Sequence, residues 1–432
     1  MPEINKIGNF RWTICALVFF ATTINYLDRQ VIGILKPLLE KDLNIGEAQY
    51  GYIITIFQLS YAFGMMIAGR LIDRFGTKIG YGISVILWSI AAMGHALAKG
   101  VTGFGFWRAL LGISESGNFP AAVKTIAEWF PKRERALATG IFNSGTNVGA
   151  IAAPLAVPVI ATAWGWQAAF LITGALGFIW VIFWFIFYEV PEKQRKLSSQ
   201  EMELIRSDSD EGEDDVKTVP WLKLIKYRQT WIFFIGKAMT DPIWWFYLFW
   251  IPGWLSEVRG AGLNIKTFGL PLVVIYTSTT VGSIFGGWLS SFMIKRGASP
   301  FNARKYTMLI FASLVVPVYF AQSRGMGTWG AIALISLAAS SHQAWSANIY
   351  TTVSDAFPKR AISSVIGIGG MAGALGGAFV SILAGYLLQF YKRAGNIETG
   401  YTVMFTIAAC AYIIAWVIMN LLSPKVKKVV ID

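Results

Sequence analysis

The chain has 432 residues, of which 55% are hydrophobic and only 14% are charged, and its mean hydropathy is +0.53. Soluble domains carry about 25% charged residues, so this composition excludes an ordinary soluble protein and indicates an integral membrane protein. The formal net charge of +13 does not indicate nucleic-acid binding, because Lys and Arg lie in short loops between apolar runs rather than along one solvated face.

Apolar runs of about 20 residues recur along the chain, and a run of this length can cross a bilayer as a helix. They predict about twelve transmembrane helices, at 11–36, 49–69, 79–98, 102–127, 136–160, 165–188, 229–256, 267–294, 305–322, 327–353, 361–390 and 400–422. One long polar segment with an acidic cluster separates two groups of six. We therefore expect an N-terminal six-helix bundle at 1–189, a solvated linker at 190–228 and a C-terminal six-helix bundle at 229–432.

Ionisable residues occur inside several of these runs, where they are costly and usually face a bundle interior or a water-filled path. Asp28 and Arg29 lie in the first run. In the fourth run, Arg108 and Glu115 are seven residues apart and therefore share a helix face. Two interpretations stay open for this pair: an internal ion pair that fixes helix packing, or residues that line a path for a charged solute. We favour the second.

The loop after the fourth run reappears after the tenth. Glu128–Gly140 and Asp355–Gly367 both contain Phe-Pro-Lys-Arg, followed at the same distance by a glycine. Two parallel repeats with a site at their interface are typical of secondary transporters. Basic residues concentrate in the loops on the side of the N-terminus, which predicts that both termini are cytoplasmic. The opposite loops are poorer in basic residues, although they contain Lys36, Lys41, Arg259, Lys392 and Arg393.

The seventh run carries a cation, Lys237, with Asp241 one turn further on, and an i,i+4 ion pair is the favoured interpretation of these two residues. Polar and aromatic residues that suit sugar hydroxyls and the face of a sugar ring are Tyr26, Tyr61, Asn143, Asn147, Trp244, Trp245, Ser341, His342, Gln343, Trp345 and Asn348. Any single Trp or Tyr is equally explained as a membrane-interface residue. A lone histidine in a membrane is often hydrogen-bonded to a neighbouring helix.

Several motifs resemble those of known transporters. Gly69-Arg-Leu-Ile-Asp-Arg-Phe-Gly-Thr-Lys78 resembles the loop signature of the major facilitator superfamily between helices two and three. Asn25-Tyr-Leu-Asp-Arg29, Arg108 with Glu115, and Glu128-Trp-Phe-Pro131 together resemble the anion:cation symporter family. The stretch from Gly236 to Pro252 looks most like the bacterial hexuronate transporters within that family.

The resemblance implies an all-α integral membrane protein with the major facilitator fold, two pseudo-symmetric six-helix bundles. The sequence gives no reason to expect an obligate oligomer, so we expect a monomer, in the bacterial cytoplasmic (inner) membrane and without cofactor or metal. Gly69, Asp73, Arg74 and Lys78 are then expected to form a latch on the cytoplasmic side. Asp28 and Glu115 are the positions that the resemblance gives to proton coupling, and a buried carboxyl group near an arginine is chemically suited to titrate.

The expected function is import of hexuronates (glucuronate or galacturonate) by proton symport with alternating access. Arg29 or Lys237 is expected to bind the substrate carboxylate, while Arg108 alternates between the substrate and the acidic residues. Another sugar acid such as galactonate, an organic-anion or sugar-phosphate exchanger of the same fold, and sodium coupling stay open. The run Gly367–Gly373 offers no polar side chain, which disfavours a galactonate-like binding pattern.

An enzyme is not expected. The sequence shows no metal-ligand cluster, phosphate-binding loop or nucleophile–base pair, and Gly112-Ile-Ser-Glu-Ser116 does not match the G-x-S-x-G pattern of a nucleophile elbow.

Overall fold

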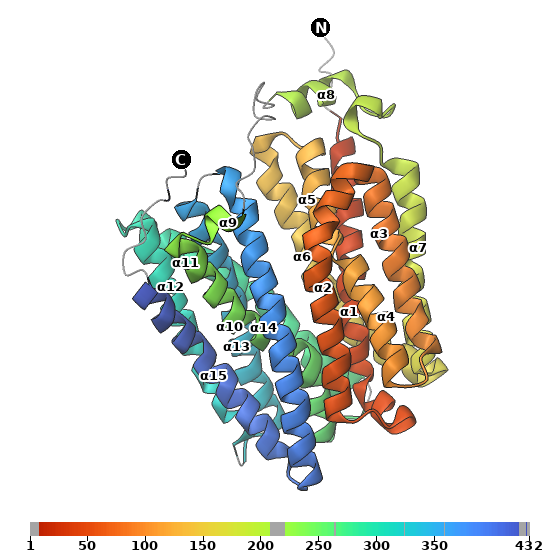
Figure 1. The fold of residues 1–432 in the computed structure, drawn as a ribbon, viewed down its shortest axis with the longest axis vertical. Helices are drawn as coiled ribbons and strands as arrows, with labels where there is room; N and C mark the ends of the chain where they lie inside the picture. Colours follow the sequence, from red (N-terminus) through yellow and green to blue (C-terminus); the bar gives the residue numbers. More distant parts are fainter. Residues whose placement is uncertain are drawn as a thin grey trace.

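The computed structural model describes residues 8–207, 221–262, 265–323, 325–357, 359–422 and 429. Within these ranges the regular structure is entirely helical (Figure 1). The acidic cluster of the predicted linker, Asp208 to Asp215, lies outside the described residues, as do the lysines at 425, 427 and 428. The side chain of Asp73 and the surroundings of Gly69 are also outside the description, although the backbone of both residues is helical.

The helices form two bundles that stand side by side (Figure 1). The first contains α1 (Phe10–Leu43), α2 (Glu47–Phe75), α3 (Thr77–Gly94), α4 (Val101–Glu115), α5 (Asn118–Trp129), α6 (Lys132–Trp164) and α7 (Trp166–Phe187). The second contains α10 (Arg228–Glu257), α11 (Leu270–Lys295), α12 (Pro300–Val315), α13 (Thr328–Ala356), α14 (Lys359–Arg393) and α15 (Ile397–Leu422). Two short helices, α8 (Ser199–Arg206) and α9 (Trp221–Leu224), lie between them in the sequence.

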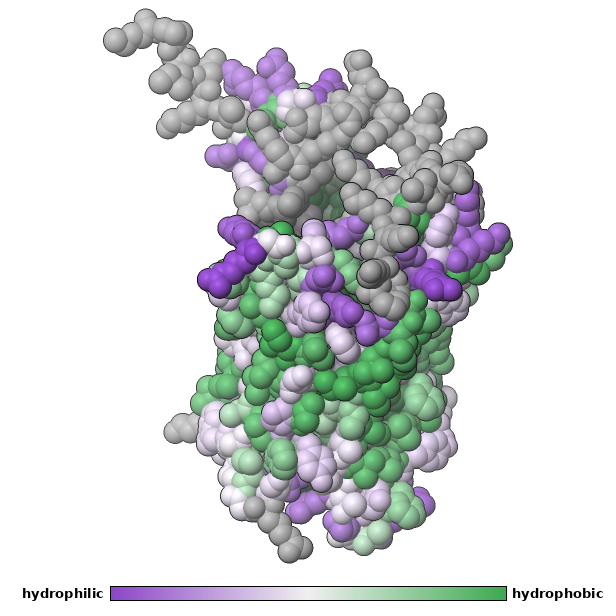
Figure 2. All heavy atoms as spheres, turned by 90° about the vertical axis from the view of Figure 1, so that its left-hand side faces the viewer, coloured by the Kyte–Doolittle hydropathy of each residue, from purple (hydrophilic) through white to green (hydrophobic). Residues whose placement is uncertain are grey.

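The outside of the molecule carries an apolar belt. Figure 2 shows hydrophobic residues around the middle of one face, with hydrophilic residues gathered towards the two ends. Large apolar side chains such as Phe63, Ile284 and Phe379 are more than half exposed, as expected where lipid replaces water. By length and composition, eight of the described helices are able to cross a membrane. The other predicted spans correspond to α2, α4 with α5, α10 and α13.

The fourth predicted span, 102–127, is not one continuous helix. It is broken at Ser116 and Gly117 into α4 and α5. The hydroxyl of Ser114 donates to the Leu110 carbonyl at 2.6 Å, and such bonds compete with the helical pattern and bend helices. A Cβ at Gly117 would overlap the Ser84 hydroxyl, so α3 packs closely against the break. As a result, Glu115 lies at the last residue of α4.

The first part of the predicted linker is fastened to the N-terminal bundle. Glu201 of α8 accepts hydrogen bonds from the backbone amides of Phe10 and Arg11, at 3.1 and 3.0 Å. These amides begin α1 and have no acceptor within their own helix. Arg11 adds an ion pair to the same carboxylate at 3.0 Å.

The two bundles meet along α2 and α14, near the turn at residues 44–46. We call the end of the molecule that carries this turn the α1–α2 end; it lies opposite the end where α1 begins (Figure 1). Here two glycines let the helices approach: a Cβ at Gly51 would lie 2.7 Å from the Ser381 carbonyl oxygen and 3.0 Å from the Gly385 Cα. Thr55 donates to the Ala378 carbonyl at 3.2 Å.

Candidate functional site

A buried ion pair joins α1 to α4 in the N-terminal bundle. Arg29 donates from Nε and Nη2 to Oε2 of Glu115, at 3.0 and 2.8 Å, and the two side chains are 2% and 0% exposed. Asn25, one turn earlier on α1, accepts from Arg29 Nη2 at 3.3 Å. Glu115 therefore pairs with Arg29, and not with Arg108, with which it shares a helix.

Aromatic rings surround the Arg29 guanidinium. Its central carbon lies 4.8 Å from the ring centroids of both Tyr26 and Tyr61, and 5.3 Å from that of Phe57. A fourth ring, Trp245 at 5.5 Å, comes from α10 of the other bundle. Cations over aromatic faces are attracted by the ring quadrupole, more strongly when water is excluded. These contacts place Arg29 at the junction of the two bundles.

Two charged residues beside this pair have no hydrogen-bond partner among the described residues. All three guanidinium nitrogens of Arg108 are unpaired although the residue is 0% exposed. Both carboxylate oxygens of Asp28, which is 3% exposed, make no hydrogen bond of ordinary distance and angle, and the hydroxyl of Thr173 is the polar group beside them. The ring of Phe57 lies 5.2 Å from the Arg108 guanidinium carbon. Leaving a charged group buried without a hydrogen-bond partner costs more than leaving a neutral group so, and this arrangement therefore does not stabilise the fold.

The predicted i,i+4 ion pair on α10 is confirmed. Lys237 Nζ lies 2.7 Å from Asp241 Oδ2 and donates to the hydroxyl of Tyr350 on α13 at 3.0 Å. On α14, the run that lacks polar side chains packs against this helix: a Cβ at Gly369 would overlap Phe233, and one at Gly373 would overlap Asp241. The glycines therefore provide close packing between α10 and α14.

The candidates on α13 divide into two groups. His342 shares a 2.7 Å hydrogen bond with Tyr412 and stacks on Trp244 with ring centroids 5.3 Å apart, and Trp345 packs edge-on against the same tyrosine. Asn348 and Ser341 instead donate to backbone carbonyls, of Gly286 and Ala344 in one case and of Leu337 in the other. These last two side chains use their donors for helix packing.

The remaining sugar-binding candidates are more open. Asn143 is exposed, and Asn147 and Gln343 are half-buried. Among the described residues, none of the three makes a hydrogen bond or ring contact with Arg29 or with the rings around it. Their role in binding stays a prediction.

The expected latch is only partly described. Arg74 is exposed, and Lys78 pairs at 2.7 Å with Glu189, which lies two residues beyond the end of α7. This hydrogen bond from Lys78 lowers the pKa of the Glu189 carboxyl group below its ordinary value. Glu128 accepts from Thr77 at 2.7 Å and also from Tyr188. The described partners of this loop therefore come from its own bundle.

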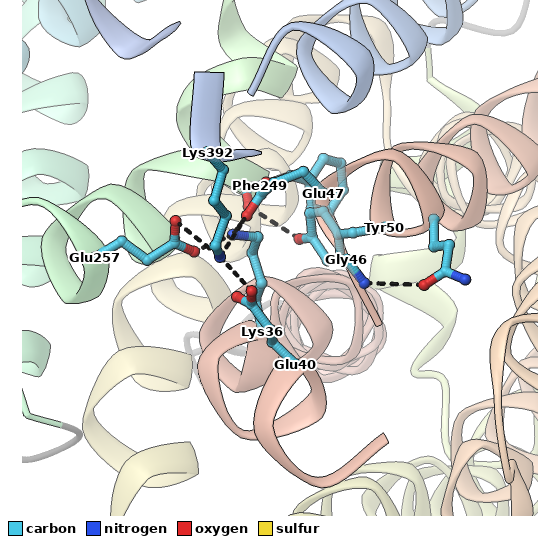
Figure 3. A network of polar contacts seen from close by, with 9 residues as sticks. Lys36, Glu40, Gly46, Glu47, Tyr50, Phe249, Glu257 and Lys392 are labelled. Atoms are coloured by element: carbon cyan, nitrogen blue, oxygen red, sulfur yellow. Dashed lines mark hydrogen bonds and ion pairs between the residues drawn. The ribbon is translucent and has the colours of Figure 1, made fainter. Parts of the chain in front are cut away.

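A network of five charged residues joins the bundles at the α1–α2 end (Figure 3). Lys36 donates to Glu47 at 2.6 Å and to Glu257 at 2.5 Å. Lys392 contacts Glu40 and lies 3.5 Å from both Glu47 and Glu257. The first bundle supplies Lys36, Glu40 and Glu47, and the second supplies Glu257 and Lys392. We call these five residues the end network.

Sequence reasoning missed several of these residues. Phe57 lies one helical turn before Tyr61 and shares its face, so its proximity to the site could have been found. Tyr350 carries no comparable signal, because its contact with Lys237 depends on how α10 and α13 pack. From the sequence, Lys36 and Lys392 stand out only as basic residues in loops that are otherwise poor in basic residues. Their ion pairs with Glu40, Glu47 and Glu257 balance their charge at this end.

Comparison with known proteins settles the family. The family model described as "Major Facilitator Superfamily" matches residues 18–381 of this chain. The chain belongs to this superfamily. Its members are transporters rather than enzymes, and membership confirms the predicted fold of membrane-spanning helices in two pseudo-symmetric bundles.

The superfamily relatives of this chain include sugar-acid transporters. It is 32% identical over 395 residues to the "Hexuronate transporter" of Escherichia coli (strain K12), covering 89% of each chain. It is 33% identical to the "Galacturonate transporter" of Dickeya chrysanthemi, over 75% of this chain and 92% of the relative. The "D-galactonate transporter" of Escherichia coli O6:H1 is 28% identical, over 90% and 92%.

Solved structures share the superfamily fold. A bacterial homolog of the human lysosomal transporter Spinster, solved in an inward-facing and unoccupied conformation, superposes with a TM-score of 0.79 at 17% identity, covering 98% of both chains. A D-xylose-proton symporter superposes with a TM-score of 0.75 at 16% identity, covering 98% of this chain and 100% of that one.

Proposed function

We propose that this superfamily member imports hexuronates, such as glucuronate or galacturonate, together with protons. The observation that carries the proposal is the buried Arg29–Glu115 pair beside the unpartnered Arg108 and Asp28. A site that holds a competing carboxylate on one arginine and leaves a second arginine free is suited to an organic anion. The named relatives, a hexuronate and a galacturonate transporter, support this substrate class.

A hexuronate is a hydroxylated ring with one carboxylate, and the site offers partners for each part. The guanidinium fork of Arg108 matches a carboxylate in two-point geometry. The rings around Arg29 offer flat apolar surfaces to the sugar. Arg29 and Lys237, the cations first expected to bind the carboxylate, each hold a protein carboxylate in this structure. For either to bind substrate, that internal partner must give way.

Proton coupling follows from this competition. A proton on Glu115 removes the negative charge that holds Arg29, so Arg29 gains capacity for the substrate carboxylate. A proton on Asp28 removes a second carboxylate charge near Arg108 in the same way. Substrate and proton then favour one another's binding, which is the thermodynamic requirement for symport.

The site also needs access from alternating sides. We propose that the bundles at 1–189 and 229–432 rock about this site as a monomer in the bacterial inner membrane. The α1–α2 end then faces outward, and both termini and the 190–228 linker face the cytoplasm. In the conformation of the structure described here, the end network and the α2–α14 contact would then keep the outer side of the site closed.

The test compares counterflow with pH-gradient-driven uptake of labelled glucuronate and galacturonate in proteoliposomes. Glu115→Gln is expected to keep counterflow and to lose accumulation driven by the gradient, because glutamine mimics the protonated acid. Glu203→Gln, an exposed change on α8, serves as the control and is expected to behave as wild type.

Three outcomes would contradict parts of the proposal. If wild type ignores the pH gradient but responds to sodium, coupling to protons is wrong. If it exchanges substrate and accumulates none, the protein is an exchanger. If galactonate or a sugar phosphate replaces both hexuronates as substrate, the substrate class is wrong while the transporter assignment stands.

A further inference from the structure

The Lys237–Asp241 pair differs from the Arg29–Glu115 pair in what it holds together. Both of its members belong to α10, so it bridges one helical turn and ties no second element. On a solvated helix an i,i+4 pair contributes about 0.2–0.5 kcal/mol, and this pair is more enclosed, with Lys237 6% exposed. It is still less enclosed than the Arg29–Glu115 pair, with Asp241 18% exposed where Glu115 is 0% exposed. Because both members lie on one helix, opening the pair separates no two helices.

The surroundings keep Lys237 in place if Asp241 moves away. Tyr350 accepts a hydrogen bond from Lys237 at 3.0 Å, and the ammonium nitrogen lies 4.5 Å from the centroid of the same ring. On the other side, Gly373 of α14 leaves the space that the Asp241 carboxylate occupies, since a Cβ there would overlap Oδ2. The position of the Asp241 carboxylate therefore requires a glycine at 373, whereas the position of the Lys237 ammonium does not.

The helix that carries this pair also reaches the aromatic rings around Arg29. Trp245, two turns further along α10, lies over the Arg29 guanidinium at 5.5 Å. The hydroxyl of Tyr350 is within electrostatic range of Tyr26 and Tyr61, the two rings nearest Arg29. Neighbours of Lys237 on α10 and α13 therefore lie beside the rings that surround Arg29.

We propose that Asp241 is a positioning residue that occupies, on Lys237, the place a substrate carboxylate takes, and that the substrate displaces it. This inference rests on the proposed function and deepens it. Asp241 and a sugar acid offer the same chemical group to the same ammonium, so only one can hold it fully. With Asp241 present, the apparent affinity for substrate is the intrinsic affinity multiplied by the fraction of molecules in which Lys237 is free. When the substrate leaves, Asp241 pairs with Lys237 again.

The test measures binding of labelled glucuronate and galacturonate to the purified full-length protein at fixed pH. Asp241→Asn is expected to bind about tenfold more tightly, the factor that applies if the pair is closed in about nine molecules of ten. Its counterflow rate is expected to fall, because release becomes slower. A residue that only supports the fold would not combine tighter binding with slower exchange.

Two further variants identify the cause. The double variant Lys237→Gln with Asp241→Asn is expected to bind no more tightly than Lys237→Gln alone, since the gain requires the lysine. Gly373→Ala, which crowds the carboxylate off Lys237, is expected to tighten binding in the same direction and serves if Asp241→Asn does not fold. Glu203→Gln is the matched loss of one carboxylate elsewhere and is expected to have no effect.

Weaker or unchanged hexuronate binding by both Asp241→Asn and Gly373→Ala would overturn this inference. The proposed function would still stand in that case, provided that wild type binds a hexuronate. A gain that persists without Lys237 would also overturn it. If wild type binds neither hexuronate, the proposed substrate is wrong and this inference falls with it.

Discussion

At the scale of single residues, two arginines of the same site have opposite energetic roles. Arg29 is buried with a carboxylate partner, and Arg108 is buried without one. Removing one member of a buried pair leaves an uncompensated charge and costs about 3–5 kcal/mol. Removing a charge that has no partner relieves a penalty instead. Two substitutions of the same kind should therefore change stability in opposite directions.

We expect Arg108→Met to raise the melting temperature of the purified protein by about 2 °C or more, and to abolish hexuronate binding. The methionine fills the space without a charge to desolvate, and the free guanidinium for the substrate is lost. Arg29→Met is the matched control and is expected to lower the melting temperature, because Glu115 loses its partner. A drop in melting temperature for Arg108→Met would show that Arg108 has a stabilising role that its contacts do not reveal.

At the scale of helices, the contact between α2 and α14 depends on small residues. Gly51 and Gly385 face each other, and a side chain on either would meet backbone atoms of the other helix. Helices in membranes associate through such close approaches, because the hydrophobic effect does not drive them together there. This contact is therefore the natural place to disturb the closed α1–α2 end without touching the site.

We expect Gly51→Leu to open this end. The reporter is Thr55→Cys, a position 5% exposed in the closed contact, in a background where Cys15 and Cys410 are replaced by Ser. Labelling by a membrane-impermeant thiol reagent should rise about fivefold or more. Gly287→Leu is the control, because a Cβ there meets nothing within 4 Å; equal labelling in both variants would mean that the α2–α14 contact does not control access.

At the scale of the whole molecule, the end network is the polar counterpart of that contact. Its lysines come one from each bundle, and each pairs with carboxylates of both (Figure 3). Rocking the bundles apart at this end separates Glu257 from Lys36. The network therefore stabilises the closed end by interactions that the open end cannot make.

We expect Glu257→Gln to shift the population towards the state open at this end. Lys36 would lose its ion pair to the other bundle and keep only Glu47 of its own, and labelling of the same Thr55→Cys reporter should increase several-fold. Glu398→Gln, an exposed carboxylate at the start of α15, is the control. Unchanged labelling in Glu257→Gln would show that the glycine contact alone holds the end closed.

The sequence predicted the fold well because its signals are local. Apolar runs of membrane length and the repeated Phe-Pro-Lys-Arg loops require no knowledge of distant contacts. The Lys237–Asp241 pair was predictable for the same reason. The partner of Glu115 was not, because it lies 86 residues away on α1 and depends on how two helices are rotated against each other. The break after Glu115 arises from serine hydroxyls and packing against α3, which hydropathy does not report.

The internal pairing in the site has a consequence for the transport cycle when no substrate is bound. Arg29, Arg108 and Lys237 carry three positive charges, and Asp28, Glu115 and Asp241 carry three negative charges in their ordinary ionised forms. Their sum is zero when all six are ionised, so in the proposed cycle an empty carrier in that form would move no net charge of the site through the low dielectric of the bilayer. Its return step is then little affected by the membrane potential. A carrier that returns empty at low cost can accumulate its substrate, rather than only exchange one molecule for another.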